Sequence, residues 1–176
     1  MFEGIKRKIG HFVVKRKYLH KNIEQLAYNN VISNAKDFFF IMPSFDKDFY
    51  HTLEILKYYQ NQKKVITLFL PEHKYNLIPD KEKFKFISFL PHQASRFYLP
   101  EKNLVARLKT KKFDVVIDLN RSENIFFSAI ANIVKSKIRI SFVKELSESY
   151  YNLQIVGKQG DSEISYKNFL NYLQMF

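Results

Sequence analysis

The sequence predicts an α/β domain with a mostly parallel sheet and helices on both faces, preceded by a basic amphipathic helix. Two patterns carry this prediction. Short, wholly apolar runs, typical of strands buried on both faces, alternate with segments whose apolar residues recur every three or four positions. Strands that alternate with helices form parallel sheets through right-handed crossovers. The length of 176 residues is within the usual range for a single domain.

The apolar runs give the positions of the strands. We expect strands at 38–42, 65–70, 84–90, 113–119, 138–143 and 150–156, the last being the weakest pattern. Pro43, Pro71 and Pro91 each follow one of the first three runs and end it. The result is a sheet of about five or six strands in a domain that spans 36–176.

Helical spacing fills the intervals between the strands. We expect helices at 46–60, 99–109, 122–134 and 162–175. Pro100 suits the first turn of the second helix. Ser122 is the expected N-cap of the third, with Glu123 in its first turn.

The segment 1–30 differs from the rest of the chain. Among the first 21 positions, Glu3 is the one acidic residue. Seven residues there are basic: Lys6, Arg7, Lys8, Lys15, Arg16, Lys17 and Lys21. An apolar stripe with helical steps accompanies them: Phe2, Ile5, Ile9, Phe12, Leu19, Ile23 and Leu26. Arg16 interrupts this stripe, and Gly4 and Gly10 weaken the first turns, so the pattern fits one long helix or two shorter ones.

A basic amphipathic helix can bind an anionic membrane surface or an acidic partner protein. We therefore expect the seven basic residues to form a docking surface. The alternative is an ordinary helix that packs on its own domain.

The net charge of +12 constrains the partners of the protein but not its fold. Nucleic acid, an anionic membrane face and a phosphorylated small molecule all fit this charge. Compositional bias is the alternative, because Lys, Asn, Ile, Phe and Tyr are abundant in chains from AT-rich genomes. The absence of cysteine excludes thiol chemistry and favours a reducing compartment.

No apolar run approaches the about 18–20 residues of a membrane span. The N-terminal apolar stretch 9–14 is short and is followed by three basic residues, which argues against a secretory signal. We therefore expect a cytoplasmic protein, peripheral at the inner membrane face if the basic helix binds lipid.

The sequence predicts neither a cofactor nor a metal. None of its four glycines, Gly4, Gly10, Gly157 and Gly160, lies in a strand-to-helix turn, so there is no dinucleotide fingerprint and no P-loop. The five histidines have no metal-ligand spacing.

The turn after the first strand carries the strongest candidate for chemistry. Ligands of open α/β sheets bind at the carboxyl ends of the strands, where this turn must lie. Asp48 and His51 are three residues apart and can share a helix face, and a carboxylate there can act as a general base. The alternative is that Asp46 caps the helix and Asp48 complements its dipole.

A second polar group follows the fourth strand. Asp118 and Asn120 lie near its carboxyl end, with Arg121 next in the chain, whereas Asp114 marks its start. These residues face the same cleft as the first turn. Turn and cap chemistry is the alternative for 120–122.

These segments resemble motifs of heptosyltransferase-like glycosyltransferases. Their first-turn motif reads roughly Pro-Ser-Ser-Leu-Gly-Asp-Val-Val-His-Ala-Leu, and the matching residues here are Pro43, Ser44, Asp48, His51 and Leu53. The segment 112–120 is similar to the family's Tyr-Asp-apolar-apolar-Ile-Asp-Leu strand, and 137–142 is similar to its Arg-Ile-Gly-Phe strand. The resemblance covers about 37–156 and leaves the basic helix outside it.

The resemblance implies the acceptor-side, N-terminal Rossmann-like half of a GT-B enzyme of the ADP-heptose:lipopolysaccharide type. It implies that Asp48 is the candidate base and that the ligand-binding residues are Ser44, Lys47, His51, Asn120 and Arg121. Lys47 replaces the family's glycine, and the donor half of the fold is not found before Phe176. The chain also resembles short uncharacterised bacterial proteins of the same half-domain shape.

We therefore expect a non-catalytic binding or scaffold module that is docked through its basic helix to a membrane or a larger complex. One alternative is an acceptor-binding subunit completed by a partner chain. The other is a basic protein associated with nucleic acid or the ribosome.

Overall fold

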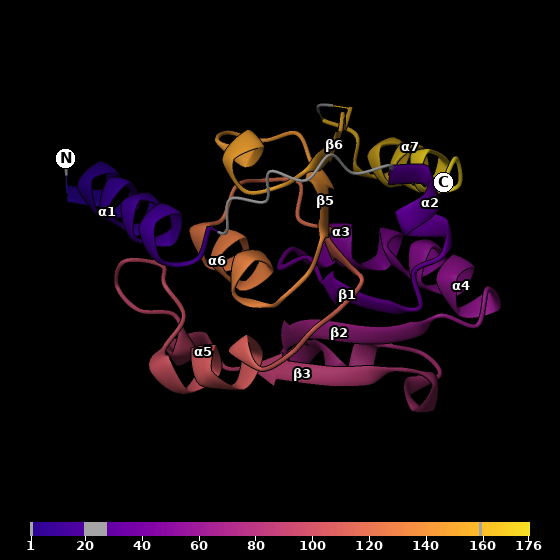
Figure 1. Cartoon of the computed structure of the whole chain (residues 1–176), viewed down its shortest axis with the longest axis horizontal. Helices are drawn as coiled ribbons and strands as arrows, with labels where there is room; N and C mark the ends of the chain where they lie inside the picture. The colour runs from indigo at the N-terminus through magenta and orange to yellow at the C-terminus, as the bar shows by residue number, and fades with distance from the viewer. Residues whose placement is uncertain (1, 20–27, 159) are drawn as a thin grey trace.

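The computed structural model describes residues 2–19, 28–158 and 160–176. Within these ranges, six parallel strands form one sheet in the order β3-β2-β1-β4-β5-β6. The strands are β1 (Asp37–Ile41), β2 (Val65–Pro71), β3 (Lys85–Phe89), β4 (Val115–Asp118), β5 (Ile138–Phe142) and β6 (Leu153–Ile155). The predicted Rossmann-like sheet is confirmed (Figure 1).

Helices cover both faces of the sheet. They are α1 (Phe2–Lys17), α2 (Tyr28–Ser33), α3 (Asp46–His51), α4 (Leu53–Asn61), α5 (Lys102–Lys109), α6 (Ile125–Ile133) and α7 (Ser162–Leu173). Short 3-10 turns are η1 (Glu72–Leu77), η2 (Lys81–Lys83), η3 (Pro91–Gln93) and η4 (Ser147–Ser149). One layer contains α2, α3, α4 and α7, and the other contains α1, α5 and α6.

The central strand β1 shows why the predicted strands are wholly apolar. Phe38 and Phe40 pack in the layer of α4 and α7, whereas Phe39 and Ile41 pack in the layer of α5 and α6. All four side chains are fully buried, because successive residues of a strand point to opposite faces and each face carries helices.

Three predicted helices differ in their boundaries. The expected helix 99–109 begins only at Lys102, so Pro100 lies before α5 and not in its first turn. The expected helix 46–60 is divided at Thr52, whose hydroxyl donates to the Phe49 carbonyl at 2.6 Å. Such side-chain bonding to the preceding turn bends helices. The expected cap Ser122 is wrong: α6 begins three residues later, where Asn124 Oδ1 accepts a hydrogen bond from the Phe126 amide at 3.0 Å.

Candidate functional site

The carboxyl edge of the sheet has the switch point at which ligands usually bind. The chain proceeds from β1 to β2 and β3 on one side and from β4 to β5 and β6 on the other. Ligands of such sheets bind outside the strand ends where the order reverses, here between β1 and β4. As predicted, the turn after β1 and the residues after β4 lie together at this edge.

Asn120 closes the switch point. Its side-chain Oδ1 accepts from the Ser44 amide at 3.2 Å, and its Nδ2 donates to the Met42 carbonyl at 3.4 Å and to Asp118 at 2.8 Å. This buried amide therefore ties the end of β4 to the end of β1. A predicted ligand-binding residue is engaged with the protein itself.

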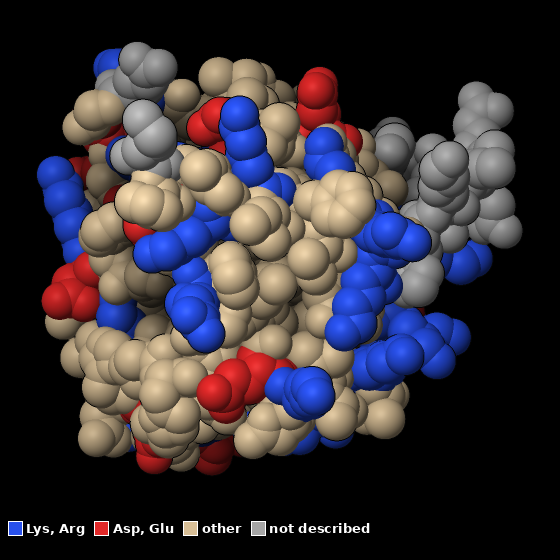
Figure 2. All heavy atoms as spheres, turned by 90° about the vertical axis from the view of Figure 1, so that its left-hand side faces the viewer, with Lys and Arg blue, Asp and Glu red and all other residues tan. Residues whose placement is uncertain are grey.

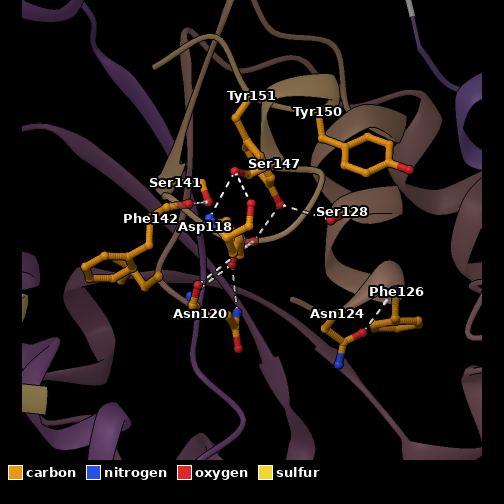
Figure 3. Close-up of polar contacts among 12 residues, drawn as sticks. Asp118, Asn120, Asn124, Phe126, Ser128, Ser141, Phe142, Ser147, Tyr150 and Tyr151 are labelled. Carbon is orange, nitrogen blue, oxygen red and sulfur yellow. Dashed lines mark hydrogen bonds and ion pairs between the residues drawn. The ribbon is translucent and has the colours of Figure 1, made fainter. Parts of the chain in front are cut away.

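Asp118 is the centre of a buried polar cluster, which we call the Asp118 cluster: Asp118, Asn120, Lys144 and Tyr151. One carboxylate oxygen accepts from Lys144 Nζ at 2.6 Å and from the Tyr151 hydroxyl at 2.5 Å. The other carboxylate oxygen accepts a hydrogen bond from the backbone amide of Asn120 at 3.0 Å. Figure 3 shows Asp118, the last residue of β4, beside Asn120, with Tyr151 above them. Lys144 also donates to the Asn120 carbonyl at 2.9 Å.

This cluster compensates its own charges. Burial, and then the negative charge of Asp118, raises the pKa of Tyr151 well above its usual value, so the tyrosine remains a hydrogen-bond donor. Asp118 is completely buried and Lys144 almost so, and a buried carboxylate is stable only when it is paired and hydrogen-bonded. The geometry assigns the cluster to holding together the ends of β4, β5 and the loop before β6.

Asp48, the candidate base, joins α3 to α7. Its carboxylate accepts a hydrogen bond from the Ser162 hydroxyl, and the Nε atom of Arg121 lies 3.7 Å away. Arg121 also donates to Ser165 of α7 at 3.3 Å. Asp48 is buried by these contacts. Its part in chemistry stays a prediction, and the contacts themselves are those of a structural tie.

The remaining residues of the first turn are divided between surface and interior. The His51 ring stacks on Tyr166 with centroids 6.2 Å apart, and the Tyr166 hydroxyl donates to the Leu119 carbonyl at 2.6 Å. Burial is the main cause of the raised pKa of Tyr166. Ser44 and Lys47 are exposed. Only these two of the predicted ligand-binding residues lie fully at the surface.

Sequence reasoning missed Lys74, a fully buried lysine under the turn after β1. Its Nζ donates to the carbonyls of Pro43, at 3.2 Å, and Ser44, and lies 3.0 Å from Asp46 Oδ1. An ammonium group therefore contacts the backbone of the turn that corresponds in position to the phosphate-binding turn of nucleotide-binding Rossmann folds. Lys74 belongs to the polar stretch 72–76, which reads as an ordinary surface turn.

At the other candidate site, α1 docks on the domain through the face that contains Gly10, His11 and the fully buried Val14. Buried His11 is hydrogen-bonded through Nδ1 to the Tyr150 hydroxyl at 2.6 Å, and its Nε2 lies 2.9 Å from Glu123. Burial first, and then the charges of Arg7 and Lys15, lowers the pKa of His11. Burial raises the pKa of Glu123.

Two further contacts fix the position of α1. A Cβ atom at Gly10 would lie 2.6 Å from the Phe97 carbonyl oxygen, so the helix approaches this loop as closely as a glycine allows. The Tyr98 hydroxyl donates to Glu3. Arg7, predicted as a docking residue, instead faces the domain, where it lies 3.3 Å from Glu123 and 3.7 Å from Glu145.

The apolar stripe of α1 faces away from the domain. Phe2 is 82%, Ile5 51%, Ile9 41% and Phe12 62% exposed, and we call these four residues the outer face. The alternative of an ordinary packed helix is thus half correct: α1 packs on its domain, but with the face opposite to its stripe. Leu19, the next residue of the predicted stripe, is partly buried and packs against the core of the domain. Lys21, Ile23 and Leu26 lie outside the described residues.

Basic side chains flank the outer face on both sides. With 3.6 residues per turn, Lys8 and Lys15 lie along one side, and Lys6 and Lys17 lie along the other. Arg16 continues the line of the outer face toward the end of the helix. Figure 2 shows the side of the molecule from which α1 projects, where lysine and arginine side chains, with fewer acidic ones among them, surround a largely uncharged area.

The fold defines a Rossmann-like α/β protein whose switch point is filled by its own polar side chains. The chain belongs to the Family of unknown function (DUF6913), which it matches over residues 11–176. Comparison with curated proteins found no match. Among residues 2–19, 28–158 and 160–176, no helix is long and apolar enough to cross a membrane, and no group of acidic and histidine side chains has the arrangement of a metal site.

Proposed function

We propose that this protein is a non-catalytic, glycosyltransferase-like module that docks on an anionic membrane surface through the outer face of α1. One observation carries the proposal. Four large apolar side chains are exposed on a helix whose opposite face is anchored by buried polar contacts. The contacts of His11 and the close approach of Gly10 hold these side chains toward solvent.

Lipid is a suitable environment for this surface. Moving about half of each apolar side chain out of water contributes roughly 1 kcal/mol or more per residue. The flanking lysines can extend their aliphatic stems along the interface and keep their ammonium groups among anionic headgroups. Juxtamembrane basic residues add electrostatic attraction within a Debye length of the surface.

An anionic membrane is favoured over an acidic protein because of the distribution of charge. The basic residues line both sides of the outer face along the whole helix, as an extended planar surface requires. The acid of this helix, Glu3, is engaged with Tyr98 and lies 3.2 Å from Lys6. A groove on a protein usually matches charges at a few fixed points instead.

The assignment as non-catalytic is supported by the carboxyl edge of the sheet. Asn120 bridges the strand ends, Lys74 braces the first turn, and Asp48 is tied to Ser162. A transferase needs polar groups that are free to contact an acceptor. The resemblance to an acceptor half that handles lipid-linked saccharides agrees with a place at the membrane.

Sedimentation with vesicles tests the proposal. The double variant Ile5→Ser/Phe12→Ser removes one aliphatic and one aromatic side chain from the outer face. The matched control, Phe45→Ser/Val156→Ser, removes the same kinds of side chain from exposed positions elsewhere, at 65% and 71% exposure. All four positions are exposed, so both variants are expected to fold.

We expect the natural protein and the control to sediment with vesicles of phosphatidylglycerol and phosphatidylcholine, and the outer-face variant to remain in the supernatant. Binding should weaken on pure phosphatidylcholine. Equal sedimentation of the two variants contradicts the proposal. Salt-sensitive binding to RNA that is lost with the outer face would instead indicate a nucleic-acid partner.

A further inference from the structure

A hollow of about 650 Å³ lies at the amino edge of the sheet, between the starts of β1, β4 and β5. Four lysines line it, and we call it the lysine hollow: Lys36, Lys112, Lys135 and Lys137. We propose that the lysine hollow binds a small polyanion that carries two or more phosphate groups. This inference does not depend on the docking of α1.

The protein balances only part of the charge of the lysine hollow. Among the described residues, its one carboxylate is that of Asp114, and none of the four lysines forms an ion pair. Asp114 accepts instead from the backbone amides of Lys36, at 2.8 Å, and Asp37, at 3.0 Å. These two hydrogen bonds first, and then the charges of Lys112 and Lys36, lower the pKa of Asp114, so the carboxylate stays ionised and directed at the backbone. One carboxylate therefore faces four lysines.

The two edges of the sheet therefore differ in whether their basic side chains form ion pairs. At the carboxyl edge, Lys74, Lys144 and Arg121 each lie within 4 Å of an aspartate. At the amino edge, four ammonium groups surround one hollow without such partners. Like charges that are brought together destabilise a fold, and a bound anion would remove that cost.

Backbone contacts hold the lysine-bearing segments at a fixed spacing. Lys112 and Lys135 pair as an isolated parallel bridge, and the Phe113 amide donates to the Lys135 carbonyl at 2.9 Å. The Ser136 hydroxyl lies within hydrogen-bond distance of two carbonyl oxygens, that of Asp114 at 3.0 Å and that of Ile138 at 2.9 Å. A preformed site loses less entropy when it binds a ligand.

The chemistry of the lining favours phosphate. Lysine binds phosphate as a point charge, and several lysines match a ligand with more than one dianionic group. The volume lies within the range of about 300–1,000 Å³ for small-molecule sites. Phe113, the aromatic residue of the lining, is buried, so it offers no open ring face on which a base could stack.

The hollow and the outer face of α1 are separate sites. The hollow lies beside the end of α2, and Figure 1 shows α1 and α2 at opposite ends of the long axis of the molecule. A failure of one proposal therefore leaves the other untouched, because soluble phosphate binding can be measured without vesicles.

Calorimetry with inorganic tripolyphosphate, at about 150 mM salt, tests the inference under conditions where surface charges are screened beyond roughly 8 Å. The variant is Lys112→Gln/Lys135→Gln. The control, Lys57→Gln/Lys167→Gln, removes the same charge from exposed positions on α4 and α7. Cooperative unfolding at a melting temperature no lower than that of the natural protein establishes that each variant folds.

We expect saturable binding of one tripolyphosphate per chain, weakened at least tenfold in the hollow variant and less than twofold in the control. A second arm measures vesicles whose lipids carry phosphomonoester headgroups, with Ile5→Ser/Phe12→Ser present in every protein so that the outer face of α1 does not contribute to binding. Loss of vesicle binding in the hollow variant identifies a lipid headgroup as the source of the phosphates, and unchanged vesicle binding identifies a free ligand. Equal weakening in the hollow variant and the control, or no saturation, overturns the inference.

Discussion

The ammonium group of Lys144 lies 2.6 Å from the fully buried carboxylate of Asp118. This pair forms an internal contact at the end of β4, at the edge where ligands of such sheets usually bind. Removal of one partner from a buried ion pair leaves the other charge uncompensated, which costs about 3–5 kcal/mol. We therefore expect Lys144→Met to lower the free energy of unfolding by about this amount.

Urea unfolding measures this effect. The matched control is Lys83→Met, which removes a lysine 2.8 Å from Asp80 at the exposed surface, where ion pairs contribute little. The control should unfold like the natural protein. An equal loss in the free energy of unfolding for both variants would show that the buried pair stabilises the fold no more than an exposed one.

Gly10 sets the distance between α1 and the loop at Phe97. A Cβ atom there would lie 2.6 Å from a backbone oxygen, so Gly10→Ala should displace the helix and cost about 1–3 kcal/mol. Hydrogen exchange of the α1 amides should accelerate. Gly4→Ala is the control, because nothing lies within 4 Å of its Cβ position. Since alanine favours helix, Gly4→Ala should stabilise α1 slightly.

The docking of α1 should depend on pH through His11. Its pKa in the folded protein lies below the ordinary value of 6.5, so the unfolded chain binds more protons near that pH. Stability from this group is therefore present above pH 6.5 and is lost as the pH falls toward the folded pKa. The charges of Arg7 and Lys15 also lower the pKa of His11, whereas the charge of Glu145 raises it.

Melting temperatures between pH 7.5 and 5.5 check this prediction against His11→Gln. The natural protein should lose more stability over this interval than the variant. Glu123 contributes with the opposite sign, because its raised pKa favours folding at lower pH. Parallel curves for the two proteins would contradict a role of His11.

The contribution of Asp48 to stability can be measured separately from any part in chemistry. Asp48→Ala leaves the buried Ser162 hydroxyl without its acceptor and should cost about 1–3 kcal/mol. Asp48→Asn should cost less, because an amide oxygen still accepts that hydrogen bond. Thermal unfolding measures both, with exposed Glu54→Ala as the control. If Asp48→Ala is as stable as the control, the tie between α3 and α7 does not stabilise the fold.

Strands and layers were predictable because burial on both faces leaves a direct trace in the sequence. The run from Phe38 to Ile41 is apolar at every position, and each position is buried. The cap of α6 was not predictable, because Ser122 and Asn124 both suit an N-cap and tertiary packing decides between them.

The candidate sites were harder to predict from the sequence than the strands and layers. Periodicity identified the stripe of Phe2 to Phe12 but not which face of α1 packs, since that depends on contacts with Tyr150 and Glu123 far along the chain. Lys74 is buried by carbonyls about thirty residues away, which no local pattern reveals. The lysine hollow did have a signal: Lys36 and Lys137 directly precede parallel strands, whose starts share one edge.

The contacts of α1 also determine when in synthesis it can take its place. Its partners Tyr98, Glu123 and Tyr150 follow it by 95 to 139 residues. At ribosomal rates of about 5–20 residues per second, the helix precedes its docking surface by several seconds. During that interval, both faces of α1 are free on the nascent chain, and only completion of the last third of the domain commits the face that contains His11 to the interior.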